Sequence, residues 1–209
     1  MENILRPTGS LSIYRRADDW ILRNVSRKAY IMGWWYNHVA KLFSRATGIP
    51  TITSQLSGML QKNGTYYDLG VMGYRVVTTA GVNFLVDAWQ TTTEMDALIY
   101  HGCGTGTGAE AIGDTALGTE CSAAGIIDIT LCTGGAYRPA GTAIEGSATN
   151  IFKTVATIGF DGGGDITEHG ILSATSTGTL WDRTKFVAVS VVATNTLVFT
   201  YEATVAAGG

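Results

Sequence analysis

Residues 196–205, TLVFTYEATV, carry the clearest structural signal in the chain. Large apolar residues occupy every second position, and mostly polar residues stand between them. This period of two is typical of a β-strand with one buried face and one face nearer to water. The expected buried set is Leu197, Phe199, Tyr201, Ala203 and Val205.

The preceding residues repeat the pattern in short runs. Each run is rich in β-branched or aromatic residues and is stopped by Gly, Asn, Asp or Ser; residues 161–165, DGGGD, resemble a hairpin turn. Several such runs in succession predict an antiparallel β-sandwich or jelly-roll-like body. The runs are residues 151–160, 166–172, 178–181 and 184–193.

The composition suits a subunit of an assembly. The chain has 209 residues, enough for one sandwich domain and an extension, and charged residues make up only 15%. About a quarter is usual for soluble domains, so we interpret the deficit as surface that neighbouring subunits cover. No window reaches about 18 uncharged apolar residues, and we therefore expect no membrane span.

The charge is divided unevenly along the chain. Residues 1–50 hold eight Lys and Arg against three Asp and Glu, whereas the remainder holds six against fourteen. A basic segment attached to an acidic body indicates a segment that meets something acidic, although a helix with an ordinary solvated face would have the same composition.

A long helix is predicted between Asp18 or Asp19, either of which can cap its first turn, and Gly48. Apolar residues recur along it at spacings of three and four, which is the pattern of an amphipathic helix. Further aromatic residues lie off this stripe, so the helix needs more than one partner surface. The stripe comprises Ile21, Val25, Ala29, Met32, Tyr36, Val39 and Phe43.

We therefore predict that the chain divides into two units. Residues 1–75 are an N-terminal arm with this helix and a connector, and residues 76–209 are a β-sandwich body with one helix near its start. Residues 51–74 are rich in Thr, Ser, Gln and Gly and are expected to be a connector with short strands at best, turning at Asn63-Gly64. In the body we expect a helix capped by Thr78 or Thr79, a strand at residues 97–100, a long loop at 101–118, a strand at 126–131 and a loop at 134–147.

The arm supplies the candidate partner-binding residues. Trp, Tyr and Arg dominate the energetics of protein interfaces, and the arm is rich in all three. Ordinary packing of these aromatics on the body is the alternative. Basic residues beside aromatics also occur in nucleic-acid stacking platforms, but the acidic body makes nucleic-acid binding an unexpected role. The candidate set is Arg15, Arg16, Trp20, Arg23, Arg27, Trp34, Trp35 and Tyr36.

No combination of residues predicts an enzyme, a cofactor or a metal site. Residues 104–109, GTGTGA, fit a dinucleotide pattern only without the helix that this motif requires. His101, Cys103, Cys121 and Cys132 are zinc-ligand types without paired spacing. Glu168 and His169 are adjacent on a predicted strand and should point to opposite faces.

Five segments, taken in order along the chain, together carry a resemblance to a known protein family. They are HGCGTG at residues 101–106, GDTALGTE at 113–120, ITEHGIL at 166–172, GTLWDR at 178–183 and LVFTY at 197–201. This series resembles a family of tailed-bacteriophage virion proteins in which a GTG and DTAL loop, an ITE strand and a GTL hairpin recur. The resemblance covers residues 97–205, and the first 75 residues match no family we can name.

The resemblance implies a β-sandwich structural module without catalysis, found in the virion. We therefore expect a capsid cement or decoration protein that forms a homo-oligomer, with a trimer as the expected state, and whose arm clamps the major capsid protein or other virion subunits. A tail or head-fibre component is the first alternative. A carbohydrate-binding sandwich, with Trp181 and Tyr137 as stacking platforms, is the second.

Overall fold

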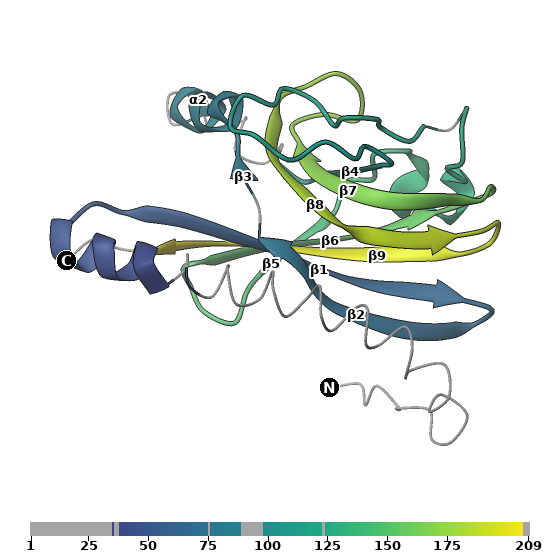
Figure 1. Cartoon of the computed structure of the whole chain (residues 1–209), viewed down its shortest axis with the longest axis horizontal. Coiled ribbons are helices and arrows are strands. Elements are labelled where there is room, and N and C mark those ends of the chain that lie inside the picture. Colours follow the sequence, from purple (N-terminus) through teal and green to yellow (C-terminus); the bar gives the residue numbers. More distant parts are fainter. Residues whose placement is uncertain (1–34, 36–37, 75, 89–97, 123, 207–209) are drawn as a thin grey trace.

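The computed structural model describes residues 35, 38–74, 76–88, 98–122 and 124–206. The described residues form nine strands in two antiparallel sheets that lie face to face, as a β-sandwich (Figure 1). The predicted fold class, mainly β with an antiparallel sandwich body, is confirmed. None of the helices among these residues has the length and apolar character needed to cross a bilayer.

The first sheet has five strands in the order β2-β1-β9-β6-β5. Its central strand is the last one in the chain, and that strand pairs with β1 on one side and β6 on the other. The five strands are β1 (Thr51–Lys62), β2 (Thr65–Tyr74), β5 (Thr142–Glu145), β6 (Ile151–Gly159) and β9 (Thr196–Ala206).

The second sheet has four strands in the order β3-β8-β7-β4. Strand β7 lies between β8 and β4 and is buried along most of its length, because loops and the first sheet cover its two faces. The four strands are β3 (Val76–Val77), β4 (Tyr100–Gly104), β7 (Gly164–Leu172) and β8 (Leu180–Val191).

The core lies between the sheets and follows the period of two seen in the sequence. On β9 the side chains of Leu197, Phe199, Tyr201 and Ala203 are buried, whereas Val198 and Thr200 are half-buried. Burying such side chains contributes roughly 1.5–3 kcal/mol each. The main cluster joins Leu197 and Phe199 to Leu56, Ile158, Phe160, Ile166 and Phe186, whereas Tyr201 packs in a second cluster with Ile171 and Trp181. Val205, which was expected in the buried set, is exposed.

Residues 51–74 are not a connector, and this expectation was wrong. They form the long hairpin of β1 and β2, and β1 pairs with β9 from Thr51 to Gln61. The predicted turn at Asn63-Gly64 is confirmed, since both residues have the positive φ angles (51° and 73°) of a tight hairpin. The body therefore begins at Thr51 rather than near residue 76.

The connections in the body differ from the prediction in two places. Residues 161–165 do not form a hairpin turn, because β6 belongs to the first sheet and β7 to the second. Residues 126–131 do not form a strand: Ile129–Leu131 is a 3₁₀ helix whose start is capped by the Asp128 carboxylate, which accepts from the Thr130 N–H. In addition, β4 begins at Tyr100, and β5 lies inside the expected loop at 134–147.

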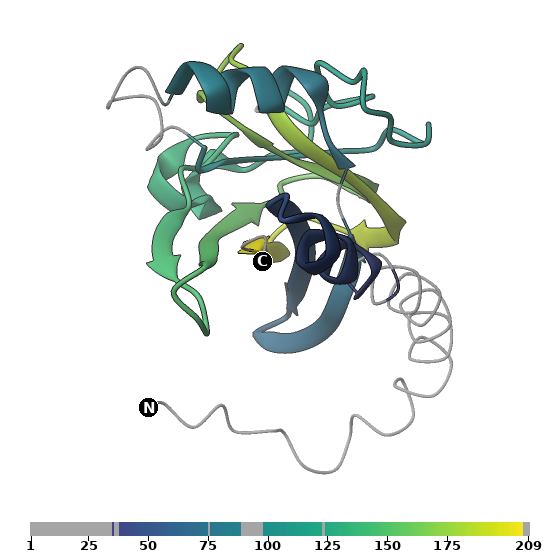
Figure 2. The same cartoon turned by 90° about the vertical axis from the view of Figure 1, so that its left-hand side faces the viewer.

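The described helices behave as expected at their ends. The first helix ends at Thr47, and Gly48 follows with φ of +72°. The second, α2 (Thr79–Ala88), is capped by Thr78, whose hydroxyl accepts a hydrogen bond of 2.9 Å from the Gly81 N–H. Figure 2 shows α2 and the loop at residues 105–120 lying over the outer face of the four-stranded sheet.

Candidate functional site

The most elaborate polar arrangement lies on the outer face of the four-stranded sheet, beneath the loop at residues 105–120, which we call the covering loop. Its centre is Glu168 on β7, which is completely buried. Its neighbour His169 faces the other way, into the core, where it contacts the ring of Phe199. The prediction that Glu168 and His169 point to opposite faces is confirmed.

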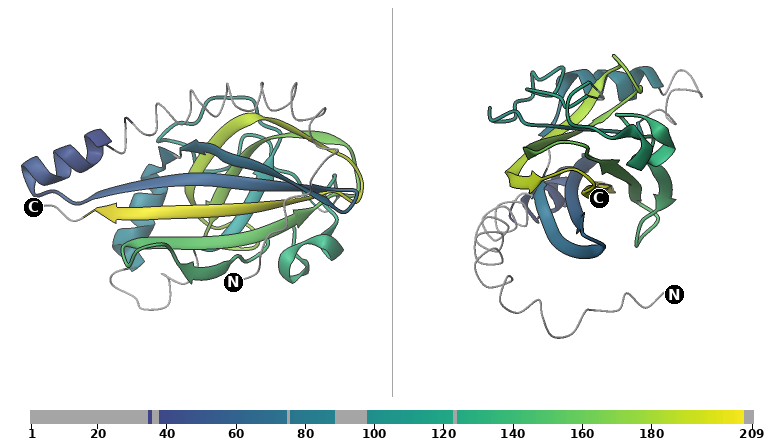
Figure 3. Two further views of the ribbon diagram at one scale, coloured as in Figure 1. Left: turned by 90° about the horizontal axis from the view of Figure 1, so that it is seen from below. Right: turned by 90° about the vertical axis from the view of Figure 1, so that its right-hand side faces the viewer.

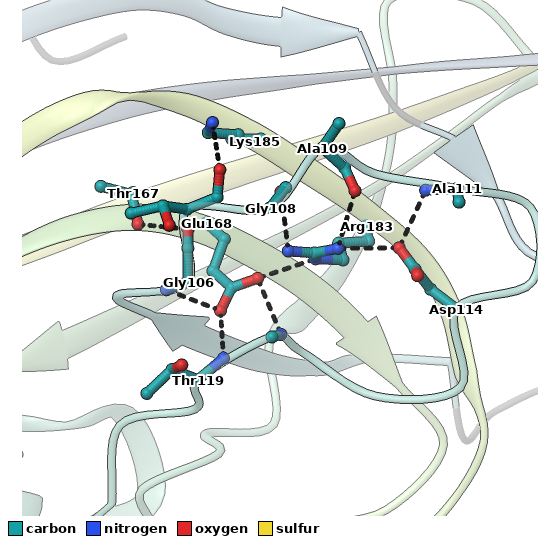
Figure 4. Close-up of polar contacts among 12 residues, drawn as sticks. Gly106, Gly108, Ala109, Ala111, Asp114, Thr119, Thr167, Glu168, Arg183 and Lys185 are labelled. Atoms are coloured by element: carbon teal, nitrogen blue, oxygen red, sulfur yellow. Dashed lines mark hydrogen bonds and ion pairs between the residues drawn. The ribbon is translucent and has the colours of Figure 1, made fainter.

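The Glu168 carboxylate is held on both oxygens (Figure 4). Oε1 accepts hydrogen bonds from the backbone N–H groups of Gly106 at 3.0 Å and Thr119 at 2.8 Å. Oε2 accepts one from the Gly118 N–H at 3.0 Å and one from Arg183 Nε at 2.7 Å. One carboxylate on a rigid strand thus fixes both ends of the covering loop.

Arg183, on β8, fixes the middle of the same loop. Its Nη1 atom donates to Asp114 Oδ2 at 2.8 Å and to the carbonyl of Ala109 at 3.4 Å, and Nη2 donates to the carbonyl of Gly108 at 3.1 Å. The planar guanidinium suits this arrangement because its donors point in fixed directions. The covering loop is therefore fastened from inside the body along its whole length.

The charges stabilise one another. Burial alone would raise the pKa of Glu168, but hydrogen bonds from Thr119, Gly118 and Arg183 together hold this pKa below its usual value. The pKa of Asp114 is also lowered, because its contacts with Arg183 and the Ala111 N–H outweigh its partial burial. Both carboxylates are consequently ionised at neutral pH and act as acceptors.

Glycine is required where the covering loop approaches Glu168. A Cβ atom on Gly106 would overlap the Glu168 carboxylate, and one on Gly104 would overlap both that carboxylate and the Thr119 carbonyl. Gly104 and Gly106 thus make room for a carboxylate of the same chain. Within the described residues, 105–119 contain no helix, so the context of a dinucleotide motif is missing.

A second ion pair holds the next part of the chain. Arg138 and Glu120 form a two-pronged pair, and Arg138 Nη1 also donates to the carbonyl of Thr177 at 2.5 Å. The pair ties the end of the covering loop to the β7–β8 connection. Tyr137 lies against the Arg138 guanidinium, with 5.7 Å between its ring centroid and Cζ.

The zinc-type residues are divided among different contacts. His101 Nδ1 lies 3.0 Å from His169 Nε2, and His101 Nε2 lies 3.3 Å from Thr154 Oγ1, so this pair bridges the two sheets. Cys103 and Cys121 share a hydrogen bond, which lowers the pKa of the Cys121 thiol. Among the residues that the structure describes, no three His, Cys, Asp or Glu side chains are placed to hold a metal ion.

Two further acidic residues of the four-stranded sheet, Asp165 and Asp182, lie apart from Glu168. Asp182 is buried and accepts a hydrogen bond of 3.3 Å from Ser54, across the two sheets. Asp165 is exposed and bonds Ser190 at the far end of β7. These contacts are structural links, and they do not assemble an acid–base pair in a shared pocket.

Trp181 is not a surface platform, which corrects the reading of it as a sugar-stacking residue. Only 5% of it is exposed, and its indole N–H donates to the Tyr201 hydroxyl at 2.6 Å. Tyr137, the second expected platform, is half-buried against Arg138. The carbohydrate alternative loses the two residues on which it depended.

Of the predicted partner-binding residues, only Trp35 lies within the described part of the chain. It belongs to the helix that ends at Thr47 and is 60% exposed. Arg15, Arg16, Trp20, Arg23, Arg27, Trp34 and Tyr36 lie outside the described residues. Farther along the same helix the large apolar side chains of Val39, Leu42 and Phe43 are exposed.

Arg183 and Asp114 stand within the motif segments, but the sequence pattern assigned them no role. Arg138 was not identified from the sequence. The sequence signal that pointed to this site was a single Glu (Glu168) inside an otherwise buried strand, followed by an Arg (Arg183) on the next strand. A buried carboxylate needs such a partner. No family model, curated protein or solved structure matches the chain.

Proposed function

We propose that this chain is a non-enzymatic structural protein of a tailed-bacteriophage virion, most simply a cement protein that clamps major capsid subunits. Support comes from the motif segments that resemble such proteins. Glu168, Arg183, Asp114, Gly106 and Gly118 all lie in those segments, and their polar groups bond within the chain. The segments therefore serve the rigidity of a scaffold rather than the binding of a small substrate.

The observation that carries the proposal is the exposed apolar helix. Val39, Leu42 and Phe43 lie on the surface of a chain whose charged content is only 15%. Apolar surface of this kind gains about 25 cal/mol per Å² when a partner covers it. Many copies, each contributing a modest contact, would stabilise a shell together.

In the proposed arrangement the sandwich body sits on the particle and the arm crosses to neighbouring subunits. The candidate contacts are those predicted from the sequence: basic residues for an acidic partner surface, and aromatic residues as anchors. Copies of the chain act as a homo-oligomer, for which a trimer is the expected state. The place of action is the virion.

Deletion of residues 1–50 tests this proposal without removing any of the nine described strands, because β1 begins at Thr51. We expect the truncated protein to remain folded by circular dichroism and to lose binding to capsids that lack the protein. Truncated protein that still saturates capsids would contradict the role of the arm.

A point variant separates a specific contact from general loss of the arm. Arg27→Glu, in the arm, is expected to weaken capsid binding, whereas Lys62→Glu, an equal charge reversal at the exposed β1–β2 turn, is not. Immunogold labelling of intact virions then distinguishes the capsid from the tail or head fibre. Label confined to the tail would replace cement with the first alternative.

A further inference from the structure

Two of the three cysteines lie opposite each other where the covering loop returns to β4. The right-hand view of Figure 3 shows this loop, in teal, on the side of the four-stranded sheet that faces away from the first sheet. Gly104 and Glu120 form an isolated β-bridge, flanked on both sides by backbone hydrogen bonds of 2.9 Å. One of these bonds runs from the Cys121 N–H to the Cys103 carbonyl. Cys121 therefore stands directly across from Cys103, one residue beyond the bridge.

The two thiols lie on the inner side of this short ladder. Side chains alternate along a strand, and opposite residues share a face. Gly104 faces outward, because a Cβ atom there would meet the Glu168 carboxylate. Cys103 thus faces the core, in which it is 1% exposed, and Cys121 packs against the same core cluster. The thiols meet there and share a hydrogen bond.

The spacing of the two residues suits a covalent bond. Opposite residues of an antiparallel pair have Cα atoms about 4.5–5.5 Å apart, within the range of about 4.4–6.8 Å that disulfides span. Their backbones are already paired, so the bond requires rotation of the side chains and no rearrangement of the strands. We propose that Cys103 and Cys121 are a site of oxidation, at which a disulfide closes the covering loop into a covalent ring.

Cys132, the third cysteine, differs from this pair in its contacts. Its Sγ atom donates to the Asp128 carbonyl and accepts from the Gly159 N–H, both at 3.3 Å. Burial raises the pKa of this thiol, which keeps it protonated and unreactive. The surrounding backbone thus holds the Cys132 sulfur in place, and we expect it to remain a thiol.

Cys121 is the residue that an oxidant reaches first, because it is half-buried whereas Cys103 is buried. The hydrogen bond from Cys103 lowers the pKa of the Cys121 thiol, against the opposing effects of burial and of two nearby carboxylates. The same hydrogen bond, together with burial, raises the pKa of Cys103. A thiolate, rather than a thiol, is the nucleophile in disulfide exchange. The pair therefore has a reactive outer sulfur and a protected inner one.

The oxidant that fits this order is a small disulfide such as oxidised glutathione. The Cys121 thiolate attacks one of its sulfur atoms, which breaks the glutathione S–S bond, releases one glutathione thiolate and leaves the other half bonded to Cys121. Cys103 then attacks the Cys121 sulfur and releases the second glutathione thiolate. Two protein thiols are oxidised and one disulfide is reduced to two thiols. The protons lost by the cysteines end on the released glutathione.

The disulfide adds a covalent link to the polar contacts that hold the covering loop. Residues 104–120 become enclosed between the linked cysteines, which also limits the conformations of this segment in the unfolded chain. The cytosol keeps thiols of this kind reduced, and an oxidising medium outside the cell allows the bond to form. The bond forms within one chain and does not depend on the proposed function.

The test treats the purified full chain with reduced or oxidised glutathione and maps its cysteines by mass spectrometry. Cleavage after Glu110, Glu120 and Asp128 places the three cysteines on separate peptides. We expect the oxidised protein to lose two hydrogen atoms in mass and to link the peptides of Cys103 and Cys121, with the third cysteine still open to alkylation after unfolding. Its Tm should be at least about 5 °C above that of the reduced protein.

Two serine variants complete the design. Cys121→Ser, at the half-buried position, should form no bond within the chain and should melt at the same temperature in both media. Cys132→Ser is the matched control. It keeps a donor and an acceptor at a site outside the pair and should still form the bond.

Any of three results would overturn the proposal: two thiols that persist in excess oxidised glutathione, a glutathione adduct that stays on Cys121, or a link that involves Cys132. A link between Cys103 and Cys121 without a higher Tm would also overturn it, because the bond would then not fasten the loop. These measurements are made on the wild type, so they decide the question even if a serine variant fails to fold.

Discussion

Arg183 Nε lies 2.7 Å from Glu168 Oε2, on neighbouring strands of the four-stranded sheet. The two residues face the covering loop from a rigid surface, and between them they bond its start, middle and end. Without these bonds, a loop of this length would open locally at little cost in free energy. The pair therefore sets the stability of the loop that bears the motif segments.

The first prediction concerns the charge of this pair. Glu168→Gln keeps the shape of the side chain but leaves Arg183 with one carboxylate fewer in a buried site. We expect a loss of about 3–5 kcal/mol in the free energy of unfolding, measured by urea denaturation. Amide hydrogen exchange should rise at Gly106, Gly118 and Thr119.

Glu202→Gln is the matched control. Glu202 bonds Lys153 at 3.5 Å and Gln55 at 2.9 Å on the half-exposed outer face of the first sheet. Its loss should cost less than about 1 kcal/mol. Equal effects of the two substitutions would contradict the central role of Glu168.

The second prediction is a loss of stability in acid. The folded-state pKa values of Glu168 and Asp114 are lowered, so these groups stabilise the fold above their unfolded pKa values of about 4. That contribution disappears as the pH falls through the lower, folded values. Unfolding free energy should decline below about pH 4.5, and the decline should be shallower in Glu168→Gln. If the free energy of unfolding falls with pH equally in the wild type and in Glu168→Gln, ionisation of Glu168 is not the cause of the decline.

The third prediction distinguishes two glycines of the covering loop. Gly106→Ala places a methyl group against the Glu168 carboxylate and should cost about 1–3 kcal/mol. Gly108→Ala meets nothing within 4 Å and should change the free energy of unfolding by less than about 1 kcal/mol. Thermal melts of both variants give the comparison. A Gly106→Ala variant as stable as the wild type would mean that the backbone at Gly106 lies farther from the Glu168 carboxylate than described.

The fourth prediction concerns two buried threonines. The hydroxyl of Thr184 has no hydrogen-bond partner among the described residues, so Thr184→Val should stabilise the protein by about 1 kcal/mol. Thr78→Val should instead destabilise it by about 1–2 kcal/mol, because Thr78 Oγ1 bonds the Leu180 carbonyl at 2.5 Å and caps α2. Chemical denaturation measures both, and a destabilised Thr184→Val would indicate that its hydroxyl has a bound partner.

The strands of the body were predictable where one face is strongly apolar. The alternation from Leu197 to Val205 predicted β9, and the runs at 151–160 and 166–172 predicted β6 and β7 to within a few residues. Thr78 and Gly48 also marked helix ends correctly. These signals are local, since each depends on residues that are close in sequence.

The failures have physical reasons. In β1 only Ser54, Leu56 and Gly58 are buried, so a strand in the middle of the body has few of the apolar residues that mark one. At residues 126–131 the Asp128 carboxylate bonds the Thr130 N–H and hydroxyl, which favours a 3₁₀ turn over the local β preference. After β6 the chain passes from the first sheet to the second. This crossing depends on pairing with distant strands, and the residues around it carry no pattern that predicts it.

The candidate site was harder to predict for the same reason. Glu168 and Arg183 are separated by a hairpin, and their partners Gly106 and Gly118 lie 62 and 50 residues before Glu168. Only the strand pairing shows that all four meet. The motif series contained the residues, but sequence alone did not reveal that they bond one another.

The position of β9 between β1 and β6 has a consequence for synthesis on the ribosome. The first strand that the structure describes has its main partner in the last one, since Thr51 pairs with Ala206. The centre of the larger sheet therefore remains open until β9 has left the exit tunnel, and pairing across such a separation is slow. During that delay the edges of β1 and β6 that later pair with β9 remain unpaired.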